Sequence, residues 1–87
     1  MHEQALMRDV VARVEAVARD ERASRVTAVR VRLGALSHFT PEHFREHFED
    51  AARGTVAEGA AVEAELSGDI SDPLAADVLV ESVEVEP

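Results

Sequence analysis

The chain has 87 residues, which is enough for one small domain with a single hydrophobic core. Its formal net charge is −9, with nine basic residues spread among eighteen acidic ones, so we expect no basic patch that could neutralise nucleic-acid phosphates. The absence of cysteine excludes disulfides, thiolate zinc sites and cysteine nucleophiles, and leaves histidine, carboxylate and backbone groups for any metal chemistry.

The N-terminal region does not have the pattern of a secretory signal peptide, because Arg8, Asp9 and Arg13 interrupt its apolar residues. No apolar run approaches the about 20 residues of a membrane-spanning helix. We therefore expect a cytoplasmic protein with neither a membrane nor a nucleic acid as partner.

The first predicted element is an amphipathic helix from Gln4 to about Asp20, in which apolar residues recur at steps of three and four. After the polar stretch "DERASR", the sequence "VTAVRVRLG" alternates valine or leucine with arginine. This alternation predicts a half-buried strand that stops at Gly34. Its inward residues would be Val29, Val31 and Leu33, and its outward residues Arg30 and Arg32.

Thr40 followed by Pro41 is typical of a helix start, with an N-cap residue and then proline at the first helical position. Phe44 and Phe48 continue this segment as a second helix that ends before Gly54. Two more strands are predicted in "EGAAVEAELSG" and "DVLVESVEVE", where apolar residues that we expect in the core, including Leu66, alternate with glutamates. Between them, residues 67–77 read "SGDISDPLAAD" and are predicted to be a loop.

These elements predict one α+β domain over residues 1–87, with two helices packed on one face of a three-stranded mixed β-sheet, in the order helix-strand-helix-strand-strand. Arginines point outward on the first strand and glutamates on the other two. Opposite charges on neighbouring strands stabilise a sheet by about 0.2–1 kcal/mol per pair, which favours the first strand in the middle. A right-handed crossover through the second helix would make the first two strands parallel.

The opening stretch "MHEQAL" is the first candidate metal site. The α-amine of Met1 and the amide and imidazole of His2 are nitrogen donors, and a nitrogen-rich square-planar set suits Ni(II) or Cu(II). Because the histidine is second in the chain, a fourth donor must come from the Glu3 amide or elsewhere. The alternative is a solvent-exposed histidine with no role.

The stretch "HFREH" is the second candidate, because it matches the H-x-x-E-H pattern of some zinc peptidases. In that interpretation His43 and His47 are ligands and Glu46 is the base. A peptidase also needs a third protein ligand and a substrate cleft, neither of which is visible in the sequence. The alternative is that both histidines lie at the edge of a buried stripe without a function, and for His38 we expect a turn or cap role.

Four segments together resemble the HypA family of nickel metallochaperones, which act in the maturation of hydrogenase and, in some organisms, urease. They are "MHEQAL", "RVTAVRVRLGALSHFTPEHFREHFE", "RGTVAEGAAVE" and the terminal "VLVESVEVE". The resemblance covers residues 1–66 nearly continuously and residues 78–86 more weakly. It implies a protein that is not an enzyme and that holds Ni(II) through the Met1 amine, the His2 imidazole and amide, and the Glu3 amide. It also implies docking on a GTPase nickel chaperone and on the hydrogenase large subunit.

The sequence departs from this family between the last two strands. Members usually carry a zinc-binding domain with two CxxC pairs there, whereas residues 67–77 contain no cysteine, so no zinc is expected. What that domain contributes in relatives is in doubt for this chain, and the histidines of "HFREH" inherit no function from the family. Nickel delivery, favoured by the intact "MHE", therefore competes with a metal-free adaptor of the maturation machinery and with a minimal metallopeptidase.

Overall fold

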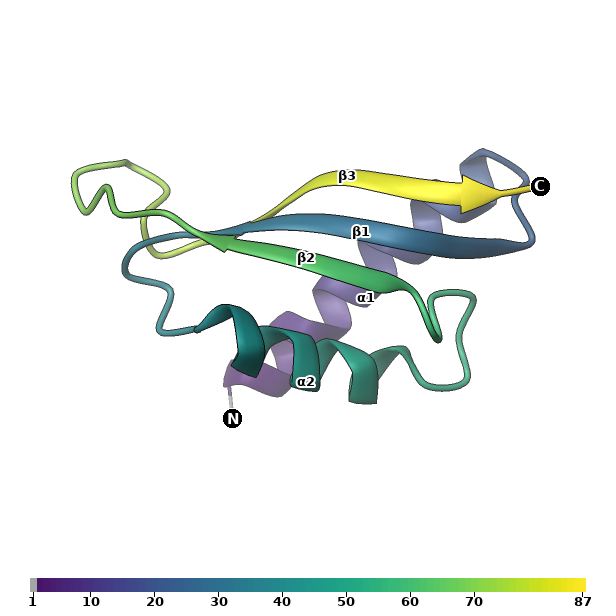
Figure 1. The fold of residues 1–87 in the computed structure, drawn as a ribbon, viewed down its shortest axis with the longest axis horizontal. Helices are drawn as coiled ribbons and strands as arrows, with labels where there is room; N and C mark the ends of the chain where they lie inside the picture. The colour runs from purple at the N-terminus through teal and green to yellow at the C-terminus, as the bar shows by residue number, and fades with distance from the viewer. Residues whose placement is uncertain (1) are drawn as a thin grey trace.

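The computed structural model describes residues 2–87, except for the side chain of His2. It contains helix α1 (His2–Asp20), strand β1 (Arg25–Leu33), helix α2 (Pro41–Ala52), strand β2 (Ala61–Leu66) and strand β3 (Val78–Glu86). Both helices lie on the same side of the three-stranded sheet (Figure 1). The predicted fold class and element order are therefore confirmed.

The sheet has the strand order β2-β1-β3, with β1 in the middle as predicted. β2 runs parallel to β1, and its glutamates face the arginines of β1 in the pairs Arg30–Glu63 and Arg32–Glu65. Arg30 Nη2 lies 3.3 Å from Glu63 Oε2, but both side chains are more than half exposed. Such pairs contribute little to stability, so their main effect is to favour this strand order over others.

β1 departs from simple alternation where it pairs with the antiparallel strand β3. The register shifts between Val26 and Ala28, and again between Arg30 and Val31. As a result Val26 and Val29, three residues apart, are both buried on the helix side of the sheet. An extra residue in one strand bends it and reverses the side-chain alternation beyond that point.

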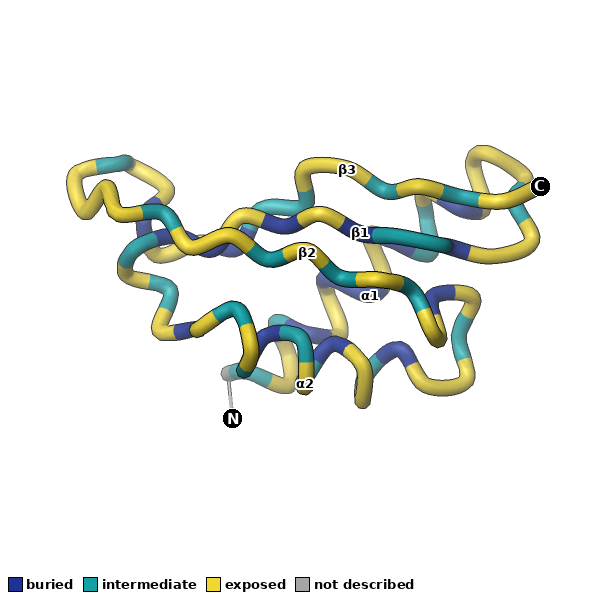
Figure 2. Tube along the Cα trace, viewed as in Figure 1, coloured by how far each residue is buried: buried dark blue, intermediate teal, exposed yellow. Residues whose placement is uncertain are grey.

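The core lies between the helices and the sheet, and buried residues concentrate on β1 and on the inner faces of the helices (Figure 2). Its largest fully buried side chains are those of Phe44, Phe48, Leu33, Val14, Val26, Val29 and Val31. The alternation in β2 predicts that Leu66 is buried, and this is wrong because Leu66 is 48% exposed. It is the last residue of an edge strand, which has a neighbouring strand on one side only.

The segment 67–77 crosses the end of β1, because it connects the two strands that flank it. The Gly34 N–H donates to the Asp77 carbonyl at 2.9 Å, and the Leu36 N–H donates to the Ala75 carbonyl at 2.7 Å. A Cβ atom at Gly34 would lie 2.1 Å from the Ala75 oxygen, so only glycine allows this close approach.

Side chains within the segment 67–77 also hold its own turns. The Ser71 hydroxyl and N–H both donate to Asp69 Oδ1, and the Leu74 N–H donates to Asp72 Oδ1 at 2.8 Å. The hydrogen bond from the Ser71 hydroxyl, followed by that from the Ser71 N–H, lowers the pKa of Asp69 below its ordinary value. These side-chain hydrogen bonds are typical of Asx turns.

Candidate metal centre

The two histidines of the second candidate site lie on one face of α2, one helical turn apart. Thr40 caps the helix, since its hydroxyl accepts a hydrogen bond from the His43 N–H at 3.1 Å, and Pro41 occupies the first turn. Residues four apart on a helix are neighbours on its surface, so His43 and His47 lie side by side. Their ring centroids are 4.4 Å apart.

Three phenylalanines orient this face of α2. Phe44 and Phe48 are fully buried against the sheet, so the histidines beside them lie at the boundary of the core. Phe39, which is 5% exposed, places its ring 5.8 Å from that of His43 and 6.5 Å from that of His47. The aromatic ring covers part of the imidazole pair and reduces its contact with water.

The carboxylate of Glu3, in the first turn of α1, completes a three-residue group. His43 Nε2 and His47 Nε2 are 2.7 Å apart, so the protonated nitrogen of one ring donates a hydrogen bond to the nitrogen of the other. Glu3 Oε2 lies 3.6 Å from His47 Nε2. One ligand atom from each of the three residues lies within 4.8 Å of the other two, and all three side chains are partly exposed. Two imidazoles and a carboxylate are typical ligands of divalent transition metals.

The structure tests the sequence-based site predictions only in part. Met1 and the side chain of His2 lie outside the described residues, so the N-terminal chelate stays a prediction. Glu46 is exposed on α2 and does not belong to the group, in which Glu3 supplies the carboxylate instead. His38 lies between β1 and α2 with a φ of 67°, in agreement with the expected turn role.

The position of Glu3 beside the histidine pair could not be derived from the local sequence. The four-residue spacing of His43 and His47 predicts that they approach each other, but their third partner comes from another helix. The start of α1 lies beside α2 (Figure 1), and this packing depends on the whole core rather than on either helix alone.

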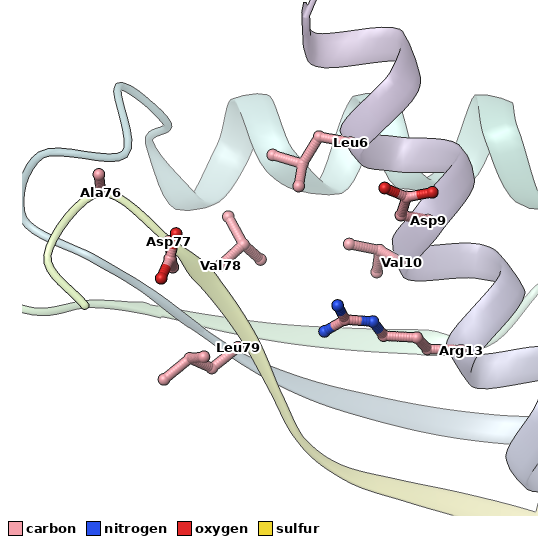
Figure 3. A pocket seen from close by; sticks show the side chains of 8 residues that line it. All are labelled: Leu6, Asp9, Val10, Arg13, Ala76, Asp77, Val78 and Leu79. Carbon is pink, nitrogen blue, oxygen red and sulfur yellow. The ribbon is translucent and has the colours of Figure 1, made fainter.

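A hollow lies between α1 and the start of β3, next to the segment 67–77. Leu6 and Val10 point from α1 toward Val78, and Arg13 extends its guanidinium across the opening (Figure 3). Asp9 and Asp77 add carboxylates at its rim. This hollow shows that residues 76–79 lie beside Leu6, Asp9, Val10 and Arg13 of α1.

Comparison with known proteins gives consistent matches. The family described as "Hydrogenase/urease nickel incorporation, metallochaperone, hypA" matches residues 1–69. The hydrogenase maturation factor HypA of Methylocella silvestris is 47% identical over 66 residues, which are 76% of this chain and 58% of that protein. HypA of Archaeoglobus fulgidus is 40% identical over 63 residues, or 72% of this chain and 57% of that protein. The chain therefore spans less than two thirds of the length of these relatives.

Among solved structures, the solution structure of the Ni metallochaperone HypA from Helicobacter pylori is similar, with a TM-score of 0.77 and 15% sequence identity. The match covers 97% of each chain and supports the fold. In the part of the chain that the structure describes, no helix has the length and apolar character needed to cross a membrane.

Proposed function

The chain belongs to the HypA family of hydrogenase and urease nickel-incorporation metallochaperones, which are not enzymes, and from this premise we propose that it binds Ni(II) at its N-terminus and delivers it for [NiFe]-hydrogenase maturation. The observation that carries the proposal is the extent of the family match, which starts at residue 1 and includes the whole "MHE" stretch. The proposed ligands are the Met1 amine, the His2 imidazole and amide, and the Glu3 amide.

The chemistry of these donors supports nickel as the cargo. Amine, imidazole and deprotonated amide nitrogens form a square-planar set, which Ni(II) accepts more readily than Mg²⁺, Ca²⁺ or structural Zn²⁺ does. The donors must release protons when they bind the metal, so the site takes up nickel at neutral pH and loses it on acidification. A site that releases its metal in this way suits a protein that passes nickel to a partner.

The position of the site suits delivery to a partner. α1 is a helix of 19 residues that begins at His2, so the proposed ligands His2 and Glu3 belong to its first turn. The Glu3 side chain is 45% exposed, which shows that this turn reaches solvent. The proposed partners are a GTPase nickel chaperone and the hydrogenase large subunit, and the proposed place of action is the cytoplasm.

We further propose that the chain works without the zinc-binding domain usual in the family. The short segment 67–77 takes its place in the chain and is held by hydrogen bonds to Gly34 and Leu36. Four large apolar side chains at this end of the sheet are exposed, namely Leu36, Leu66, Ile70 and Leu74. We propose that these side chains contact a partner protein.

Calorimetric titration with Ni(II) tests the proposal on protein whose N-terminus is native. Replacing His2 by alanine, or adding one residue before Met1, is expected to abolish the tightest nickel binding, because each change removes a donor. His38→Asn is the control, since it removes an imidazole elsewhere and asparagine tolerates the positive φ of this residue. If His2→Ala bound nickel as tightly as the parent protein, the N-terminal site would be refuted, and retained binding to the GTPase would then favour the metal-free adaptor.

A further inference from the structure

The side chains of Glu3, His43 and His47 come from two helices and converge at one point of the surface. Outside a metal site, two imidazole nitrogens approach to 2.7 Å only when they share a proton. A metal ion can replace that proton and bind both nitrogens, because neutral imidazole and carboxylate are the forms that ligate divalent metals.

The distances fit a metal without a change of backbone. If each bond to the metal is about 2.1 Å, nitrogens 2.7 Å apart subtend about 80° at the ion, and an oxygen 3.6 Å from a nitrogen subtends about 120°. The first angle is close to the right angle between neighbouring ligands in square-planar or octahedral sites. Two ligand atoms of one ion can be at most about 4.2 Å apart, so a Glu3 carboxylate oxygen must come within that distance of the His43 nitrogen. A rotation of the partly exposed Glu3 side chain allows this.

The surroundings of the group leave the metal accessible from one side. Phe39 packs against the two imidazole rings. A hollow lined by Gln4, Met7, Arg8, His47, Asp50 and Ala51 opens next to His47. In that hollow Asp50 is paired with Arg53 at 2.6 Å, and Arg8 contributes a positive charge that disfavours a cation. Three protein ligands with open coordination positions allow exchange of the ion instead of permanent retention.

We infer that Glu3, His43 and His47 form a second, weaker site for Ni(II) or a divalent metal of similar chemistry, separate from the N-terminal chelate. None of its ligand atoms belongs to Met1 or His2, so this site does not depend on the proposed function. If the proposed chelate also forms, Glu3 would offer its carboxylate to this site and its backbone amide to the chelate. Two metal ions would then bind next to each other, which gives nickel a short path between the tip of α1 and the surface of α2.

The test separates the two sites by changing them one at a time. One residue added before Met1 removes the chelate, and this extended protein is titrated with Ni(II) alone by calorimetry. We expect about one nickel per extended chain. His43→Gln and His47→Gln are each expected to weaken this binding at least about tenfold, because loss of even an outer-shell partner costs a metal site that much. Glu3→Gln, which removes the carboxylate ligand contributed by α1, is also expected to weaken nickel binding.

Matched controls are Glu46→Gln on the same helix and His38→Asn in the preceding turn, which should leave the affinity of the extended protein unchanged. Circular dichroism without metal establishes that each variant is folded. The inference is overturned if the extended protein binds no nickel, or if the folded His43→Gln and His47→Gln variants bind it as tightly as their parent. An extended protein that still binds two nickel ions would instead refute the N-terminal chelate and leave the second site supported.

Discussion

Replacing Gly34 by alanine is expected to destabilise the fold by detaching the segment 67–77 from β1. The new Cβ would lie 2.1 Å from the Ala75 oxygen, 2.5 Å from the Ala75 carbonyl carbon and 2.9 Å from the Asp77 oxygen. Since ordinary contacts begin near 3.4 Å, the segment must move away by more than about 1 Å. All three contacts are to backbone atoms, so no side-chain rotation can relieve them.

The expected magnitude follows from what this movement breaks. The hydrogen bonds from Gly34 to Asp77 and from Leu36 to Ala75 would be lost, at about 1 kcal/mol each, and overpacking adds about 1–3 kcal/mol. The free energy of unfolding should therefore fall by about 3–5 kcal/mol. In a domain of this size that lowers the melting temperature by at least about 12 °C.

Urea unfolding monitored by circular dichroism measures this effect, with Gly68→Ala as the matched control. Gly68 lies in the same segment, has open space where its Cβ would be, and does not adopt a positive φ. Its replacement should change the free energy of unfolding by less than about 1 kcal/mol. If Gly34→Ala were as stable as Gly68→Ala, the close approach of residues 34 and 75 would not exist in solution and the reasoning would fail.

Three further predictions concern the cap of α2, the segment 67–77 and the metal. Thr40→Ala should lower the free energy of unfolding by about 1 kcal/mol in urea titrations, whereas Thr40→Ser should retain most of the stability because it keeps the capping hydroxyl. Ser71→Ala should raise the pKa of Asp69 toward its ordinary value in a carboxyl NMR titration, because the main hydrogen bond that lowers it is removed. Since the folded-state pKa is the lower one, the stabilisation from Asp69 is present above the unfolded-state pKa near 3.8 and disappears as the pH falls through the folded-state value. Nickel at about 100 times its dissociation constant should stabilise the extended protein by about 2.7 kcal/mol in thermal melts, and an unchanged melting temperature would contradict binding to the folded state.

The main features of the fold could be predicted because each has a local cause. Thr40 and Pro41 signal the start of α2, and the outward arginines of β1 favour a central position beside glutamate-bearing strands. In the structure Arg30 and Arg32 face glutamates on β2, whereas on β3 they lie opposite Ser82 and Leu79 and only Arg25 faces a glutamate, Glu86. The register shift near Val26 could not be predicted, since "VTAV" is compatible with regular alternation and the irregularity depends on pairing with β3. The exposure of Leu66 was missed for a related reason, because an apolar residue in an alternating pattern is buried only where another element covers it.

In the candidate site, the closeness of His43 and His47 could be predicted from their four-residue spacing, but the third residue of the group, Glu3, could not. Glu3 stands 40 residues before His43 in the sequence, and nothing in either segment specifies that the start of α1 packs beside α2. Glu46 is nearer in sequence to both histidines, yet it projects to solvent. A carboxylate within one helical turn is therefore a poor guide to metal ligation when the face of the helix is not considered.

The central position of β1 also has a consequence for how the chain reaches this structure. Val29 pairs with Val62 on one side and Val83 on the other, and Ser24, just before β1, is hydrogen-bonded to Glu86, 62 residues away. Because such distant pairings require closure of long loops, we expect folding to be slow for a domain of this size, with the helices forming before the sheet. Until β2 and β3 have paired with β1, both edges of β1 are free to pair with a strand of another chain. Arg25, Arg30 and Arg32 then protect it, since strands that carry the same charges repel each other.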